Sequence, residues 1–252
     1  MSIFRRNKAA IINFSGTITS QSIAPYVSLI KKIEKIDSIK GVLFTINSPG
    51  GSAIHSELLY FAIERLKKKG KKVYGYLELA ASGGYLVASS LERLYTPPSG
   101  IIGSIGVISM KPVLKEILGK IGIDYEILKK GKYKDMWSFT RRYTDEERAS
   151  IDELQEDIYL RFIEIVSEGR KIPKDDVLKL ATGELFSSKK SLSNKLVDEI
   201  SDLDKAIEDL CKEINVNPEK VIYMQIKKPF FQKIINRSMV GIIEDIYYNL
   251  MF

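Results

Sequence analysis

The sequence has very few of the side chains that build disulfides, metal centres and histidine-dependent active sites. Its 252 residues include one cysteine, Cys211, and one histidine, His55. A single cysteine can form neither an internal disulfide nor a multi-thiolate zinc or iron-sulfur site, so we expect a packed core to provide the stability and we expect no metal. A single histidine excludes sites that need two imidazoles, and a Ser-His-Asp triad would depend on His55 alone.

Long apolar runs are also missing. The uncharged stretch at residues 9–30 follows three basic residues, but its apolar run ends at residue 14, and polar residues and a proline interrupt the remainder. This run is too short for the apolar core of a signal peptide or for the roughly 20 residues of a membrane span. We therefore predict a β-strand at residues 9–14, followed by a loop.

Neither sign of charge is in large excess. The 39 Lys and Arg residues against 32 Asp and Glu residues give a net charge of +7, and most lysines alternate with acidic residues. This pattern does not indicate a nucleic-acid-binding protein, although it is compatible with contact to a membrane surface or an acidic neighbour. A hydrophobic fraction of 44% with 28% charged residues is typical of a soluble globular protein.

Strand and helix patterns alternate along the chain. Short apolar runs predict further strands at residues 41–46, 72–77, 93–96, 106–109, 123–128 and 220–226. Apolar spacings of three and four predict helices at residues 27–36, 54–66, 84–91, 144–169, 175–182, 187–194 and 202–214. This alternation predicts one compact α/β domain, residues 1–226, with a mainly parallel sheet covered by helices.

Two of these helices have recognisable starts. The helix at residues 54–66 follows Ser52, a candidate N-cap, and its apolar residues at spacings of three and four are Ile54, Leu58, Phe61, Ala62 and Leu66. The long helix begins at Thr144, which with Glu147 fits a capping box.

The C-terminal segment, residues 227–252, differs from the rest because apolar side chains between Phe230 and Phe252 form a wide face. Such a face needs a partner surface. We expect it to pack on the chain's own body or on a neighbouring subunit; the alternative is a membrane surface, which nearby lysines and an arginine would favour.

Two glycine-rich turns provide the candidate chemistry. Asn-Ser-Pro-Gly-Gly-Ser at residues 47–52 and Ala-Ala-Ser-Gly-Gly-Tyr at residues 80–85 each lie between a strand and a helix. Turns of this kind expose backbone N–H groups, which can hold a phosphate or the oxyanion of an acyl-transfer intermediate. Their glycine spacing fits neither a P-loop nor a dinucleotide-binding fingerprint.

Ser82, at the start of the second helix, is a candidate nucleophile that needs a base. His55 is one candidate base, although its position on the first turn of a helix is more typical of a structural residue. A lysine can also serve if its pKa is lowered far enough for the amine to be neutral. Four lysines follow the strand predicted at residues 123–128, and the residue pattern alone does not choose among them: Lys129, Lys130, Lys132 and Lys134.

Five motifs in order resemble the signal peptide peptidase A family. They lie at residues 44–52, 80–85, 103–107, 131–135 (Gly-Lys-Tyr-Lys-Asp) and 144–148, and the resemblance runs from about residue 9 to residue 200. Each motif occurs once, so the chain is similar to the short members of the family. The resemblance implies the fold shared by Clp protease and crotonase.

The resemblance also implies a serine peptidase with a Ser/Lys dyad and no cofactor. Matched by motif, Ser82 becomes the nucleophile, Lys134 the general base, and the turn at Gly50 and Gly51 the oxyanion hole. The expected substrates are remnant signal peptides and other membrane-released peptides. The expected partners are further copies of the chain in a ring or dome, in which serine and lysine can come from neighbouring subunits.

The family's usual N-terminal membrane anchor is not found ahead of these motifs. We therefore expect either association with the cytoplasmic membrane through other contacts or a soluble protein. Two other classes of function fit the fold: a crotonase-like acyl-CoA enzyme, which gives no reason for Ser82 and Lys134 together, and a non-catalytic oligomeric scaffold.

Overall fold

A computed structural model describes residues 7–226, and the segment predicted at residues 227–252 lies outside the described residues. The core is an eight-stranded sheet in the order β6-β5-β3-β2-β1-β8, with β4 beside β3 and β7. All pairings are parallel except that of β5 with β6. The strands are β1 Lys8–Ser15, β2 Ile39–Ser48, β3 Lys72–Ala81, β4 Arg93–Thr96, β5 Ile101–Gly103, β6 Leu185–Ser187, β7 Glu199–Ile200 and β8 Val221–Tyr223.

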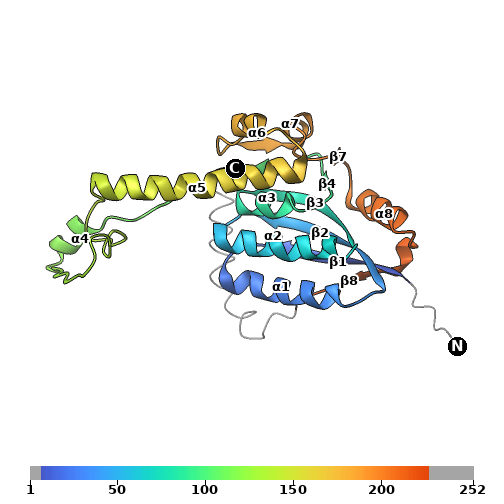
Figure 1. Cartoon of the computed structure of the whole chain (residues 1–252), viewed down its shortest axis with the longest axis horizontal. Helices are drawn as coiled ribbons and strands as arrows, with labels where there is room; N and C mark the ends of the chain where they lie inside the picture. Colours follow the sequence, from blue (N-terminus) through green and yellow to red (C-terminus); the bar gives the residue numbers. More distant parts are fainter. Residues whose placement is uncertain (1–6, 227–252) are drawn as a thin grey trace.

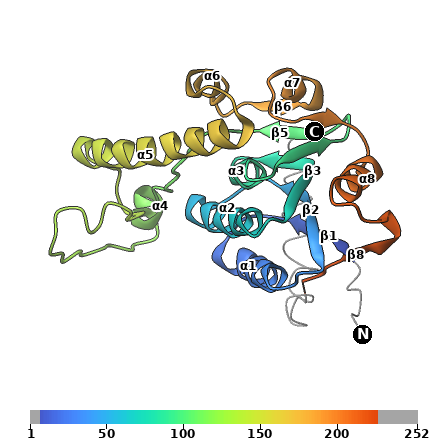
Figure 2. The same ribbon diagram turned by 45° about the vertical axis from the view of Figure 1, so that its right-hand side comes forward.

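Helices cover both faces of this sheet (Figure 1, Figure 2). Helices α1, α2, α3 and the second half of α5 pack on one face, whereas α8 packs on the other. The predicted α/β fold with a mainly parallel sheet is therefore confirmed. The helices are α1 Ser20–Glu34, α2 Ala53–Lys68, α3 Gly83–Ala88, α4 Lys115–Lys120, α5 Asp145–Arg170, α6 Lys174–Leu180, α7 Ser188–Ser193 and α8 Leu203–Glu213, with a 3-10 turn at Pro218–Lys220.

Strand β1 shows why the sheet is buried on both sides. Its side chains alternate in direction, so Ile12 and Phe14 enter the core beneath α1 to α3, while Ile11 enters the smaller core beneath α8. A strand that is apolar on both faces has a continuous run of apolar residues in its sequence, and this run is the pattern from which β1 was predicted.

The apolar residues predicted for α2 lie on two sides of the helix. Ala62 and Leu66 are buried in the core, together with Leu59 and Ile63, whereas Ile54, Leu58 and Phe61 are exposed. The helix has apolar residues on two sides, so spacing alone could not decide which side meets the sheet. The outer apolar side of α2 consequently has no cover in the described part of one chain.

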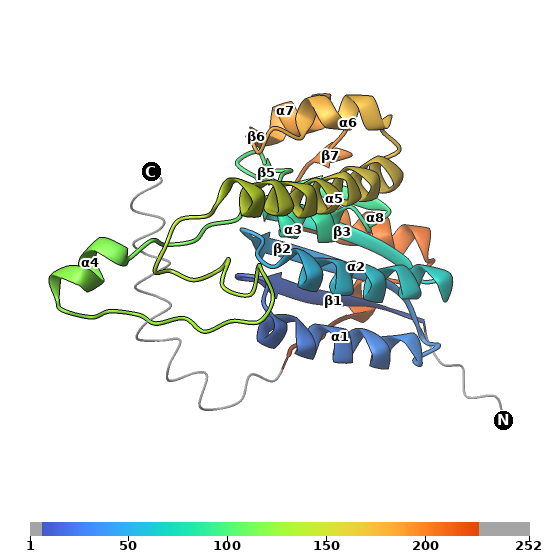
Figure 3. The same cartoon turned by 60° about the vertical axis from the view of Figure 1, so that its left-hand side comes forward.

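Two predicted strands are wrong. Residues 106–109 and 123–128 have no regular secondary structure and pair with no described strand. Both belong to a long connection between β5 and α5, in which residues 109–143 form an arm that contains α4 and extends away from the sheet (Figure 1, Figure 2, Figure 3). The edge strand that such runs could have joined, β5, is already paired with β6.

The arm has a small interior and a large apolar surface. The Lys111 amine lies 3.6 Å from the centroid of the Tyr143 ring, and the Trp137 ring meets Tyr143 edge to face at 5.9 Å. The apolar residues of the arm that remain exposed are Met110, Val113, Ile117, Ile121, Ile123, Tyr125, Ile127, Leu128, Tyr133, Trp137 and Phe139. Exposed apolar surface of this extent is uncommon on a soluble monomer.

None of the helices within residues 7–226 combines the length and the hydropathy needed to cross a bilayer.

Candidate active site

Ser82 lies at a sharp turn between a strand and a helix. Strand β3 ends at Ala81, α3 begins at Gly83, and Ser82 between them has φ 49° and ψ −123°. A positive φ is strained for a residue with a side chain, and such strain is typical of functional positions. The Ser82 amide donates to the Gly103 carbonyl at 2.8 Å, which ties the turn to the end of β5. A strand–turn–helix of this kind is the arrangement that presents a nucleophilic serine above a sheet.

The glycine turn after β2 packs directly against Ser82. Gly50 has φ 98°, and a Cβ at this position would lie 2.7 Å from the Gly83 nitrogen and 2.8 Å from Ser82 Cβ. Gly51 has φ 145°, and a Cβ there would lie 2.3 Å from the Ile18 carbonyl oxygen. Only glycine allows this approach of two backbones. Two motifs 30 residues apart in the sequence thus meet at one site, as their positions after neighbouring parallel strands require.

The backbone amides where the two turns meet differ in whether their N–H groups already donate a hydrogen bond. The Gly50 N–H donates to Ser48 Oγ at 3.2 Å. By contrast, the Gly51 and Gly83 amides donate to no acceptor within residues 7–226. Two backbone amides without an acceptor in the described part of the chain therefore lie at this meeting point, and one of them, Gly51, belongs to the predicted pair of Gly50 and Gly51. Sequence reasoning missed Gly83, although the residue after a nucleophile at a helix start commonly donates in this way.

A hollow of about 470 Å³ opens beside Ser82. One wall comes from the chain just after β5, a second from the first half of α5 and a third from the turn after α6. Tyr159 of α5 lines the hollow and donates a hydrogen bond of 2.6 Å to the Ala181 carbonyl. The lining residues are Ser82, Ser104, Gly106, Val107, Ile108, Asp152, Gln155, Glu156, Tyr159, Ala181, Thr182 and Gly183.

Lys134 does not line this hollow. It is an exposed residue of the arm, and within residues 7–226 its amine makes neither a hydrogen bond nor an ion pair. The segment around it is a turn instead of the extended chain assumed for the lysines at 130, 132 and 134, so the alternation that would place their side chains on one face does not apply. One chain therefore brings together Ser82 and the glycine turn but leaves Lys134 apart from them.

His55 is also absent from the lining of the Ser82 hollow. It lies in the first turn of α2, where its Nδ1 is 2.8 Å from Ser52 Oγ. This contact occupies the Ser52 hydroxyl, which makes no capping hydrogen bond to the helix. His55 thus has a local partner in Ser52 and makes no hydrogen bond to Ser82 among the described residues.

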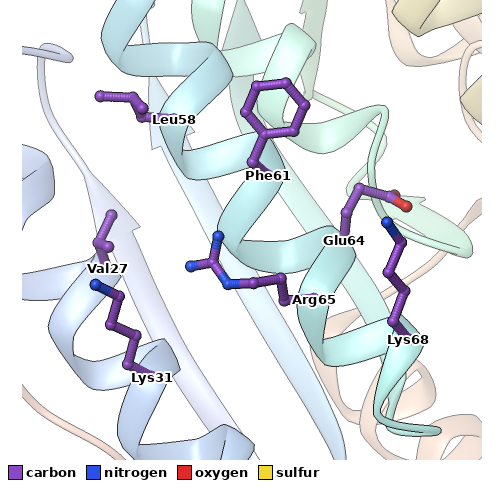
Figure 4. Close-up of a pocket in the computed structure, with 7 residues that line it drawn as sticks. All are labelled: Val27, Lys31, Leu58, Phe61, Glu64, Arg65 and Lys68. Carbon is purple, nitrogen blue, oxygen red and sulfur yellow. The ribbon is translucent and has the colours of Figure 1, made fainter.

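A second hollow, of about 490 Å³, lies between α1 and α2 (Figure 4). The exposed Leu58 and Phe61 of α2 and Val27 of α1 form its apolar part, and the charged lining includes Lys31 and Glu64. It contains no nucleophile. Within residues 7–226, no three His, Cys, Asp or Glu side chains gather in a way that could hold a metal ion.

The sequence matches known proteins over most of its length. The family model for peptidase family S49 matches residues 65–217, which include Ser82 and Lys134. A protein of Methanocaldococcus jannaschii named as a protease is 38% identical over 200 residues, or 79% of this chain and 64% of that protein. An Enterococcus faecium protein named as signal peptide peptidase SppA is 31% identical over 78% of this chain and 58% of its own length. The chain thus spans less than two thirds of either relative.

The fold also has a solved counterpart. The membrane-bound stomatin-specific protease 1510-N superposes with a TM-score of 0.55, covering 87% of this chain and 98% of the other at 13% identity. This likeness confirms the predicted peptidase fold of the Clp type.

Proposed function

The chain belongs to peptidase family S49, and from this premise we propose that it is a serine endopeptidase with Ser82 as nucleophile and Lys134 as general base. The observation that carries the proposal is the strained turn at Ser82, flanked by the free amides of Gly51 and Gly83. A nucleophile beside two unoccupied backbone donors is the arrangement that acyl transfer requires.

The reaction would proceed in two steps. The lysine amine, in its neutral form, removes the Ser82 proton while Oγ attacks the substrate carbonyl, and the Gly51 and Gly83 amides stabilise the oxyanion. The lysine then gives the proton to the leaving amine, which departs as the acyl-enzyme forms. In the second step, the same lysine activates a water that hydrolyses the acyl-enzyme and frees Ser82.

We propose that the lysine reaches Ser82 from a neighbouring chain. Within one chain, Lys134 lies on the arm and outside the Ser82 hollow. The arm also exposes apolar side chains that need a partner surface. Assembly of several copies into a ring would bury these side chains and complete each site with the arm of the next copy.

Peptides released from membranes are the proposed substrates. The Enterococcus relative is named as a signal peptide peptidase, and the Val107 and Ile108 side chains beside Ser82 offer an apolar surface to small or apolar residues near the cut. An extended peptide could lie along the backbone of residues 104–108. A location at the surface of the cytoplasmic membrane would suit such substrates.

Three single substitutions test the proposal, with turnover of an apolar model peptide and labelling by a fluorophosphonate as measurements. Ser82→Ala should abolish both signals, and Lys134→Ala should nearly abolish turnover, because serine without a base is a weak nucleophile. His55→Ala serves as the control and should leave turnover close to that of the unsubstituted protein. Near-normal turnover of Lys134→Ala would refute the lysine base. A failure of Ser82 to react at all would favour a scaffold or an acyl-CoA enzyme instead.

A further inference from the structure

The turn that carries Lys134 is held on both sides. The Lys134 amide donates to the Gly131 carbonyl at 3.3 Å, and the Met136 amide donates to the Tyr133 carbonyl at 3.1 Å. The Lys134 amine itself has no partner within residues 7–226 and remains available. The backbone of this residue is therefore ordered while its functional atom is free.

Asp135, the next residue, anchors the turn through its carboxylate. It accepts a hydrogen bond from Arg141 Nε at 2.9 Å and forms a second ion pair with Lys129. These two cations hold the pKa of Asp135 well below its usual range. The carboxylate is thus ionised at any pH at which a peptidase would act, and it points to Arg141 instead of to Lys134.

Arg141 joins this anchor to helix α5. Its Nη1 and Nη2 donate to the two carboxylate oxygens of Glu147, at 2.7 and 2.5 Å. Glu147 is 3% exposed and also completes the predicted capping box, accepting from the Thr144 amide at 2.9 Å. Arg141 and the Thr144 amide lower the pKa of Glu147 to about 2. One guanidinium therefore links the lysine turn to the first turn of α5.

Only arginine has the geometry for this link. Its planar group donates through Nε to one carboxylate and through both Nη atoms to another, whereas a lysine amine is a single point of charge. A neighbouring contact, Lys132 to Glu146 at 2.5 Å, also reaches α5, but both side chains are more than half exposed. Exposed pairs of that kind contribute little, so the Arg141 link is the firmer of the two.

Helix α5 continues from this link to the Ser82 hollow. Its residues Asp152, Gln155, Glu156 and Tyr159 line that hollow, so one rigid helix carries the lysine turn at its start and a wall of the nucleophile's site further on. We propose that Arg141 is a positioning residue, which fixes the Lys134 turn to α5 through Asp135 and Glu147 so that the lysine is presented in one orientation. This inference rests on the proposed function of Lys134 as the base.

The test compares Arg141→Gln with Arg142→Gln in the full chain. Arg142 is the adjacent arginine, its side chain is exposed and it makes no side-chain ion pair among the described residues, so it is a matched control. We expect Arg141→Gln to lower kcat about tenfold to a hundredfold, because a displaced catalytic group loses that much rate, while KM stays within about twofold. Arg141→Lys keeps the positive charge but lacks the planar guanidinium, so its kcat should lie between those of Arg141→Gln and the unsubstituted protein. Arg142→Gln should change neither constant.

A double variant separates positioning from general weakening. In a Lys134→Ala background, Arg141→Gln should cause no further loss of the slow fluorophosphonate labelling of Ser82, since no lysine is left to position. Unchanged kcat in Arg141→Gln would overturn the inference. An equal loss of labelling with and without Lys134 would overturn it too. So would a loss of kcat that occurs only together with a smaller assembly in light scattering, because Arg141 would then be purely structural. Failure of the proposed function looks different: Lys134→Ala alone would retain its turnover.

Discussion

Gly50 is the glycine at which the turn after β2 approaches the backbone next to Ser82. Two separate features require glycine at position 50: its φ is positive, and an added Cβ would lie 2.7 Å from the Gly83 nitrogen. Another glycine of the chain has the positive φ without the close neighbour. Gly16 has φ 88° and nothing within 4 Å of where a Cβ would stand. A comparison of the two glycines therefore separates backbone strain from crowding.

We expect Gly16→Ala to cost about 1–2 kcal/mol of unfolding free energy, the cost of placing a side chain at a left-handed φ. Gly50→Ala should cost more and should also abolish labelling of Ser82, because the added methyl group displaces the Gly83 amide. Urea unfolding and fluorophosphonate labelling measure the two effects. Equal losses in the two variants, with labelling intact, would show that the turn does not shape the site.

Glu147 makes a second prediction at the scale of one residue. Its pKa of about 2 lies below that of an unfolded glutamate, so its contribution to stability is present above about pH 4.3 and is lost as the pH falls towards 2. The melting temperature of Glu147→Gln should therefore lie below that of the unsubstituted chain at pH 7, and the two should converge in acid. Glu153→Gln, at an exposed position of the same helix, should show no such difference at either pH. A gap that persists at pH 2 would contradict the assignment.

At the scale of an element, helix α2 has an apolar side that the sheet does not use. Ile63→Ala, in the core, should cost about 2–5 kcal/mol, whereas Phe61→Ala, on the outer side, should stay within about 0.5 kcal/mol. Denaturant unfolding of the isolated chain at low concentration distinguishes them. If Phe61→Ala costs as much as Ile63→Ala, another surface must cover the outer side of α2.

Sequence reasoning predicted the elements whose signals are local in the chain. These are strands that are buried on both faces and helices that begin with a capping motif. Strand β1 and helix α5 were predicted correctly because a two-sided apolar run and a Thr144–Glu147 capping box need no further information. The runs at residues 106–109 and 123–128 failed because a strand also needs a free edge to pair with, and β5 pairs with β6 instead. Apolar composition alone does not record which surface will bury a run.

The candidate site was also predictable only in part. Ser82 and the turn at Gly50 and Gly51 follow neighbouring parallel strands, so the topology brings them together. Lys134 follows no strand and lies on the arm, and neither the spacing nor the fold of one chain places it near Ser82. Its role still depends on the motif resemblance and remains a prediction.

At the scale of the whole molecule, the separation of serine and lysine allows a test by complementation. Ser82→Ala retains the lysine, and Lys134→Ala retains the serine, so each is inactive alone. Coexpressed at equal levels, they should recover about a quarter of the unsubstituted activity if each site takes its two residues from different chains, because random mixing pairs them correctly at that frequency. No recovery in a mixed assembly of normal size would show that the dyad forms within one chain.

The arm that holds Lys134 apart from Ser82 also bears on when the enzyme would become active. Under the proposed function, a newly synthesised chain is latent, because it carries nucleophile and base but cannot join them by itself. Activity would then rise more steeply than in proportion to protein concentration, and a diluted sample returned to high concentration would show a lag before hydrolysis reached its steady rate. Such a peptidase needs no separate inhibitor during synthesis, because at low concentration the chains do not assemble and therefore remain inactive.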